Sequence, residues 1–229
     1  MSLTFGPLST TRYVVNGVPF DTVRVPPGRC VDGGEGTEKR ALLVSRPFEI
    51  GMTLVTQALW RAVMGSIPEA TPSSFRGDDR PAESVSWNDT QAFLGQLGSL
   101  GLRGFRLPAE AEWAWAARCG ASTWWAGADR VESVAVVDRR STSPVGGLLP
   151  SVAGALDLSG NLLEWQQDWF FNPPAAGIDS EGLASGLNRV FRGGCWDIGP
   201  QGARVASRGG YTPGGRLSIL GVRLLRTAP

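Results

Sequence analysis

Histidine is absent from the 229 residues. Histidine is the usual general base near neutral pH and the most common neutral metal ligand in proteins. Its absence excludes catalysis by a Ser-His or Cys-His pair. It also excludes a zinc or iron site built on imidazole.

Cysteine is scarce and scattered, with only Cys30, Cys119 and Cys195 in the chain. This spacing forms neither a CxxC redox motif nor a zinc-binding cluster. We expect buried free thiols in a reducing compartment. One disulfide with an odd thiol left over is the alternative.

No charge of one sign dominates, because 22 basic residues face 21 acidic ones. A formal net charge of +1 gives no strong field for nucleic acid or an anionic membrane. Long apolar runs are missing, and the N-terminus lacks the pattern of a signal peptide. We expect a soluble bacterial or phage-encoded protein with no nucleic-acid partner and no membrane insertion, and its final localisation stays open.

Lysine is almost absent, since Lys39 is the only one among the basic residues. Arginine, glycine, alanine and proline all have GC-rich codons, so this preference first indicates a GC-rich genome. It favours a thermostable protein only weakly.

Apolar residues make up 42% of the chain, and tryptophan occurs nine times. This length and composition fit one domain with a large core. Two β-rich runs around Asn16-Gly17 predict a hairpin over 11–24. We expect a loop over 26–40 and a pair of strands over 41–51.

Helices are predicted in the first half of the chain by their caps. Thr56 precedes an amphipathic segment that ends at Gly65, and Ser86 begins a second helix with Asp89 at the third position. A third helix follows Pro108 and stops at Gly120.

The second half of the chain reads as short strands and long loops. We expect loops with at most one short strand over 126–156, a strand over 189–196 that runs into a Gly-Gly bend, and a final strand over 220–225. This order predicts an α+β domain with two to three helices, and it argues against a parallel βαβ sheet.

Six segments carry a family resemblance in their order and spacing: FEIGMTLVTQALWRAVMG (48–65), ESVSWNDTQAFLGQLG (83–98), FRLPAEAEWAWAARCG (105–120), LDLSGNLLEWQQDW (156–169), RVFRGGCW (189–196) and ARVASR with GVRLL (203–225). Together they resemble the C-type-lectin fold of the formylglycine-generating-enzyme, or sulfatase-modifying-factor, type. The resemblance implies one domain over residues 1–229. The family usually has a Thr cap after RLP, where this chain has Ala109, so we expect that helix to fray or to be capped by other groups.

Both catalytic branches of this resemblance lack their residues here. Formylglycine-generating enzymes use two cysteines shortly after the RGG-W motif, and residues 197–208 contain none. Ergothioneine-synthase-like iron enzymes use a three-histidine domain. We therefore expect a non-catalytic protein without a cofactor. The alternatives are an oxidoreductase acting through Cys195, which stands where the family usually has Ser, and a purely structural module of a larger assembly.

The segment 192–225 resembles the variable region of diversity-generating-retroelement target proteins. In these lectin-fold binders, reverse transcription randomises chosen surface residues between fixed ones. The resemblance implies a fixed scaffold of Arg192, Gly193, Gly194, Trp196, Arg204, Ala206, Arg208, Pro213, Arg216, Gly221 and Arg223. It implies ligand-binding positions at Asp197, Ile198, Gly202, Gly209, Gly210, Tyr211, Gly215, Leu217, Ser218 and Ile219.

The residue types at these ten positions agree with that interpretation. An Asn codon randomised at its two adenines can encode every residue found there, but not Trp, Lys, Glu, Gln or Met. Tyr, Ser and Gly are also favoured in binding loops. The implied partner is an unknown protein or surface ligand, and ordinary turns and strand packing are the alternative for these residues.

Two further groups leave a choice open. Asn161 and Glu164 could hold a structural calcium, or could form a turn and a buried hydrogen bond. The arginines at 192, 204, 208 and 223 could contact ligand, but we expect them to tie loops and strands together. Trp87, Trp113, Trp165 and Trp196 are predicted core residues.

Overall fold

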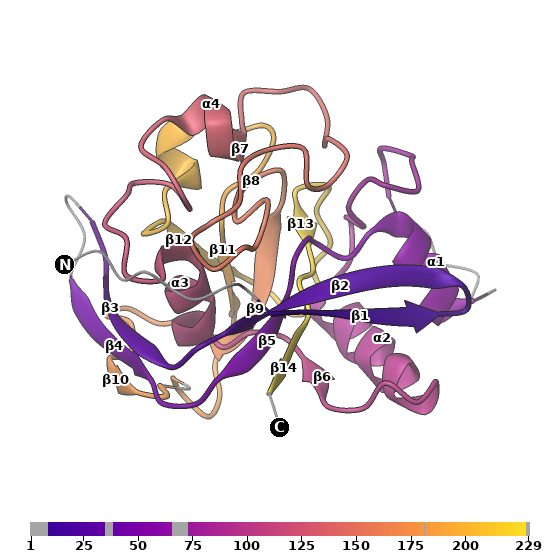
Figure 1. Cartoon of the computed structure of the whole chain (residues 1–229), viewed down its shortest axis with the longest axis horizontal. Coiled ribbons are helices and arrows are strands. Elements are labelled where there is room, and N and C mark those ends of the chain that lie inside the picture. Colours follow the sequence, from indigo (N-terminus) through magenta and orange to yellow (C-terminus); the bar gives the residue numbers. More distant parts are fainter. Residues whose placement is uncertain (1–8, 35–38, 66–72, 181, 228–229) are drawn as a thin grey trace.

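The computed structural model describes residues 9–34, 39–65, 73–180 and 182–227. Helices and short strands are mixed, which confirms the predicted α+β class (Figure 1). The helices are α1 (Gln57–Met64), α2 (Trp87–Ser99), α3 (Glu110–Arg118), the single turn α4 (Val131–Val134) and the 3-10 turn η1 (Pro200–Ala203). In Figure 1, α1 and α2 lie on one side of the molecule and α3 on the other.

A five-stranded sheet joins the two ends of the chain. Its order is β1-β2-β5-β14-β6. The strands are β1 (Thr10–Val15), β2 (Val18–Val25), β5 (Phe48–Gly51), β14 (Leu225–Thr227) and β6 (Phe105–Arg106). β1 and β2 form the predicted hairpin, with Val15 opposite Val18.

A four-stranded sheet carries most of the segment 192–225, in the order β12-β11-β9-β13. The strands are β9 (Leu163–Trp169), β11 (Arg189–Arg192), β12 (Arg208–Tyr211) and β13 (Leu220–Gly221). Glu164 on β9 lies opposite Arg192 on one side and Gly221 on the other. The centre of this sheet therefore brings three motifs together.

The prediction of a loop over 26–40 was wrong. Residues Gly28–Asp32 form β3, which pairs with β4 (Arg40–Val44) in the sheet β10-β4-β3, where β10 is Gly177–Ile178. Prolines and glycines on either side hid a short edge strand whose residues alternate in exposure.

Other boundaries also need correction. β4 and β5 are strands as predicted, but they lie in different sheets and do not pair with each other. Residues 126–156 include α4 and the two-residue strand β7 (Ala135–Val136), which pairs with β8 (Ser159–Gly160). The predicted final strand over 220–225 is divided between β13 and β14.

The caps of the first two helices are as predicted. The Thr56 hydroxyl accepts a hydrogen bond from the Leu59 N–H at 3.2 Å. Ser86 and Asp89 form a reciprocal capping box, each side chain accepting from the other's backbone N–H.

The third helix is capped by carboxylates in place of a hydroxyl. Ala109 occupies the N-cap and offers no side-chain acceptor. Glu112 accepts from the Ala109 N–H at 2.8 Å, and Asp168 on β9 accepts from the Glu110 N–H at 2.7 Å. The expectation that other groups cap this helix is confirmed, and the cap ties α3 to the four-stranded sheet.

Two large hydrophobic clusters fill the interior. One packs α3, through Trp113 and Trp115, against β2 and β5. The other packs α1 and α2 around Trp60, Phe93 and Trp165. Of the four predicted core tryptophans, Trp113 and Trp165 are fully buried, whereas Trp87 and Trp196 are partly exposed. Among the described residues, no helix is long and apolar enough to span a membrane.

Replacement of Ala109 by Thr should complete the capping box that Glu112 already half forms. We expect the free energy of unfolding to rise by about 0.5–1 kcal/mol, because the hydroxyl can accept from the Glu112 N–H. Ala109→Val is the matched control, since it has the same branched shape without the oxygen. Urea denaturation should rank Thr above Val, and equal stabilities would contradict the assignment.

Candidate functional site

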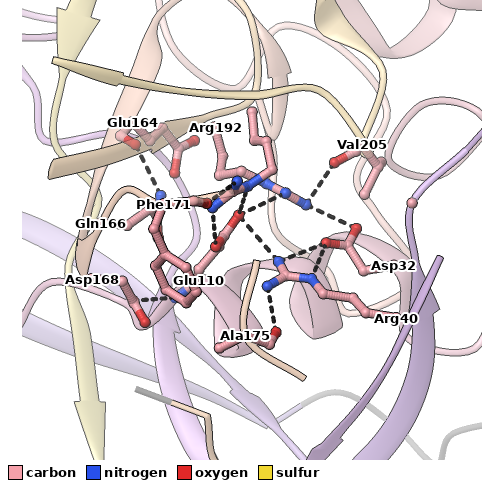
Figure 2. Close-up of polar contacts among 12 residues, drawn as sticks. Asp32, Arg40, Glu110, Glu164, Gln166, Asp168, Phe171, Ala175, Arg192 and Val205 are labelled. Atoms are coloured by element: carbon pink, nitrogen blue, oxygen red, sulfur yellow. Dashed lines mark hydrogen bonds and ion pairs between the residues drawn. The ribbon is translucent and has the colours of Figure 1, made fainter. Parts of the chain in front are cut away.

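Arg192, at the end of β11, is fully buried among charged partners (Figure 2). Its Nη2 donates to Asp32 at 2.9 Å and to the Val205 carbonyl at 2.8 Å, and its Nη1 donates to Glu110 at 3.0 Å. One side chain thus joins β3, the first turn of α3 and the loop after η1.

The two carboxylates of this cluster each bind further arginines. Arg40 lies 2.8 Å from Asp32 and 3.1 Å from Glu110, and Arg208 lies 2.7 Å from Glu110. Burial alone would raise the pKa of Asp32, but Arg192 and Arg40 hold that pKa at about 2. Burial also raises the pKa of Glu110, but Arg192, Arg208 and Arg40 outweigh it and lower that pKa overall.

The pKa of Asp168 shifts in the opposite direction to those of Asp32 and Glu110. Burial raises the pKa of Asp168 to about 7, and the nearby Glu110 and Glu112 carboxylates add to the rise. The hydrogen bond from the Glu110 N–H only partly offsets it.

Arg223 ties the end of the segment to β9. It binds Glu164 at 2.8 Å, and neither side chain is exposed. Its Nη1 donates to the Gly51 carbonyl at 2.9 Å and its Nη2 to the Leu156 carbonyl at 2.7 Å. Glu164 also accepts from the indole N–H of Trp113 at 2.8 Å.

The remaining scaffold arginines act nearer the surface. Arg216 binds Asp89 on α2 at 2.7 Å with both side chains partly exposed. Arg204 stacks on Trp124, with its guanidinium carbon 4.2 Å from the ring centroid. The prediction that arginines tie loops and strands together is confirmed for Arg192, Arg208 and Arg223.

Along the chain, the ten candidate positions lie between the scaffold arginines. None of the ten is buried, and Asp197 is exposed. Three lie on β12 (Gly209, Gly210 and Tyr211), one lies in η1 (Gly202), and the others lie in turns, bends and loops (Asp197, Ile198, Gly215, Leu217, Ser218 and Ile219).

Two of the three scaffold glycines differ from the candidate glycines in backbone geometry. Gly193 and Gly194 have φ of 97° and 76°, a region that other residues rarely adopt. A Cβ on Gly194 would lie 2.5 Å from the Ala203 backbone. The candidate glycines at 202, 209, 210 and 215 have no such φ, so their backbone accepts other residues.

Neighbouring side chains cover the candidate glycines. A Cβ on Gly209 would meet the ring of Phe191 at 2.4 Å, and one on Gly210 would meet Phe170 at 2.5 Å. Tyr211 covers Gly215 and Ile198 covers Gly202 in the same way. A larger residue at these positions requires the covering side chain to turn aside. The sequence did not indicate Phe170 or Phe191 as parts of this surface.

Asn161 and Glu164 use their side-chain oxygens within the protein. The Asn161 side chain exchanges hydrogen bonds with the backbone of Ser143, at 3.0 and 3.2 Å, and both oxygens of Glu164 accept from Arg223. This favours the turn and the buried hydrogen bond over calcium. Within the described ranges, no group of three acidic or cysteine side chains could hold a metal ion.

Cys195 is fully buried directly after the Gly-Gly bend. Its thiol lies 3.1 Å from the Asp197 carboxylate. Burial, with a further contribution from Asp197, raises the pKa of Cys195 to about 12. All three cysteines are free, as expected; Cys119 and Cys195 are also buried, as expected, whereas Cys30 is partly exposed.

Removal of the Arg192 guanidinium should be far more costly than removal of an exposed one. Arg192→Met leaves Asp32 and Glu110 buried with fewer counter-charges, so we expect a loss of about 3–5 kcal/mol of folding free energy. Arg216→Met is the matched control, with an expected loss within about 1 kcal/mol. Urea unfolding measures both, and similar losses would refute the distinction.

Comparisons with known proteins agree with this architecture. The model of the sulfatase-modifying factor enzyme 1-like domain matches residues 15–228. The formylglycine-generating enzyme of Streptomyces coelicolor is 32% identical over 199 residues, which cover 76% of this chain and 60% of that protein. The chain thus spans about 60% of that relative's length.

Solved structures extend the comparison to the whole described fold. Treponema denticola variable protein 1 has a TM-score of 0.87 and 28% identity, and the match covers 96% of this chain and 99% of that one. PvdO from Pseudomonas aeruginosa, with a TM-score of 0.76 and 21% identity over 91% of this chain and 94% of its own, shares the fold. These matches confirm the resemblances drawn from the sequence, and the chain belongs to the family of sulfatase-modifying factor enzyme 1-like domains.

Proposed function

We propose that this chain is a non-catalytic display protein whose ten candidate positions form a ligand-binding surface diversified by a retroelement. The observation that carries the proposal is a structural difference between two sets of residues within 192–225. Scaffold arginines reach carboxylates outside the segment, whereas the candidates lie between them with partly exposed side chains.

The candidate side chains have few polar ties to the frame. In the described part of the chain, the one side-chain hydrogen bond among the ten is that of the Cys195 thiol with Asp197. Tyr211 and Leu217 pack against the second hydrophobic cluster but remain partly exposed. Exchange of these residues therefore removes little of what holds the fold.

Likeness to a variable protein supports the same function. Identity of 28% over nearly the full length of both chains is closer than a shared fold requires. A surface of Tyr, Ser, Gly and aliphatic side chains suits recognition of a protein or another surface ligand, because it combines contact area with adaptable hydrogen bonding.

The chemistry at Cys195 favours binding over catalysis. A pKa of about 12 leaves almost no thiolate at neutral pH, and the thiolate is the reactive form. Residues 197–208 supply no second thiol. An oxidoreductase acting through Cys195 would require a more acidic thiol at Cys195 and a second cysteine nearby.

A library confined to the ten positions tests the proposal. All ten are replaced together by random draws from Asn codons randomised at their two adenines. Displayed clones are then selected on biotinylated lysozyme as the probe. We expect a substantial fraction of clones to keep a cooperative thermal transition, because none of the ten positions is buried, and we expect the unfolded clones to be those with large residues at Gly202, Gly209, Gly210 and Gly215. We also expect binders to emerge.

Two controls make the outcome specific. The same randomisation at Arg192, Gly193, Gly194 and Gly221 should abolish folding in most clones. A second library at ten partly exposed positions of β1, β2 and α2 should fold but yield fewer binders. Equal recovery of binders from that second library would contradict the proposal, as would general unfolding of the first.

A further inference from the structure

β12 is an edge strand of the four-stranded sheet, because it pairs with β11 on one side only (Figure 1). It carries three of the ten candidate positions, Gly209, Gly210 and Tyr211. In an antiparallel ladder, every second residue of an edge strand directs its backbone N–H and C=O away from its neighbour. The outer edge of β12 therefore presents hydrogen-bonding groups that β11 does not use.

These outward backbone groups have no partner within the described part of the chain. Apart from the ladder with β11, no hydrogen bond there involves the backbone of Arg208–Tyr211. All residues of β12 are partly exposed. Beyond the strand, the Pro213 carbonyl accepts from the Asn88 N–H at 3.1 Å, which fixes this end of the edge beside α2.

The opposite edge of the same sheet is covered. Gly221 on β13 forms a β-bridge to Glu83, and a Cβ on Gly221 would lie 2.9 Å from the Ala82 carbonyl oxygen. The Leu220 N–H donates to the Leu217 carbonyl at 3.1 Å. The sheet is thus closed at β13 and open at β12.

The side chains of β12 do not oppose pairing with another strand. Exposed charges and prolines are a common protection of edge strands in soluble proteins. The charged residue of β12, Arg208, directs its guanidinium to the Glu110 carboxylate, at 2.7 and 3.0 Å, and its side chain is only 14% exposed. An added strand would therefore bury no unpaired charge. Gly209 and Gly210 have no side chain that would hold a second backbone away.

Aromatic rings flank the two glycines. A Cβ on Gly209 would meet the Phe191 ring at 2.4 Å, one on Gly210 would meet the Phe170 ring at 2.5 Å, and both phenylalanines are partly exposed. Side chains of a strand paired with β12 would lie beside these glycines and within reach of the rings. β-branched and aromatic side chains suit such positions, because they pack well against neighbours on a sheet.

Diversification leaves this edge unchanged. Randomised codons replace the side chains at Gly209, Gly210 and Tyr211, but every variant other than one with proline keeps the same backbone donors and acceptors. The backbone would supply affinity for an extended segment, and the varied side chains would supply specificity.

We propose that the ligand of the candidate surface is a protein that contributes an extended segment, which pairs with β12 as a fifth strand of this sheet. The backbone of the segment binds the outward N–H and C=O groups of β12. Its β-branched or aromatic side chains contact Phe170 and Phe191. This inference rests on the proposed display function and deepens it, because it assigns the ligand to polypeptides and excludes a glycan.

Amide hydrogen exchange on the isotope-labelled full chain, followed by NMR, tests whether the edge is open and what closes it. In the free protein, one of the adjacent Gly209 and Gly210 amides should exchange fast and the other slowly, since only one points outward. The probe is a synthetic peptide enriched from a random-peptide library displayed on phage. We expect alternating β-branched or aromatic residues in it, and we expect it to slow exchange of the outward amide.

Three results would overturn the proposal. They are slow exchange of both glycine amides in the free chain, failure to enrich a peptide that protects β12, and pairing of β12 with a second copy of the chain. Sedimentation of the free chain detects the last of these.

Proline variants test the backbone contact itself. Replacement of the outward-facing glycine by Pro removes the free N–H but leaves the ladder with β11 intact, so the chain should fold. The same glycine replaced by Ala is the matched control, since it adds a Cβ but keeps the N–H. We expect the peptide to bind the Pro variant about tenfold more weakly than the Ala variant, the loss of one hydrogen bond. Equal affinities in two variants with cooperative thermal transitions would refute the contact.

The library at the ten candidate positions separates this inference from the display function. Binders from that library whose affinity is the same with Pro as with Ala at the outward-facing position would refute strand pairing and leave the display function standing. A library without binders, together with a peptide that still protects β12, would refute the display function and leave strand pairing standing.

Discussion

The burial of Arg192 is the constraint on which the rest of this structure depends. A fully buried guanidinium must be surrounded by carboxylates and carbonyls, or it would not remain charged in the interior. Here those partners come from β3, α3 and the loop after η1. The Arg223–Glu164 pair is another fully buried ion pair, near the C-terminal end of the segment. Hydrophobic packing forms the two cores, and these ion pairs fix how segment 192–225 is attached to them.

Because the scaffold arginines attach the segment to the cores, the residues between them do not have to. A surface that varies should carry few of the interactions that specify the fold. In the described part of the chain, the ten candidate side chains have one hydrogen bond, at Asp197, although Tyr211 and Leu217 pack against the second hydrophobic cluster. The ten positions do not act independently of one another, however. Tyr211 covers Gly215 and Ile198 covers Gly202, so a change at one position alters the space at another. Phe170 and Phe191 are outside the candidate set, but a larger residue at Gly210 or Gly209 would displace their rings.

Local rules in the sequence predicted the helices well, because Thr56 and Ser86 are strong caps and the apolar faces follow a helical period. They failed at β3, where flanking glycines and prolines suggested a loop. Consequently Asp32 was not recognised as the partner of Arg192, since the two are joined only by the tertiary fold. The ten candidate positions came from a family resemblance, and the structure adds where they lie.

The sequence of the DNA downstream of the gene tests the central claim most directly. The account predicts a near-copy of the region that encodes residues 192–225, with a reverse-transcriptase gene beside it. The copy should differ from the gene only where the copy has adenine. Those differences should fall in codons of the ten candidates and leave the codons for Arg192, Gly193, Gly194 and Arg223 identical. Absence of such a copy, or differences in the codons of the buried frame, would contradict the account.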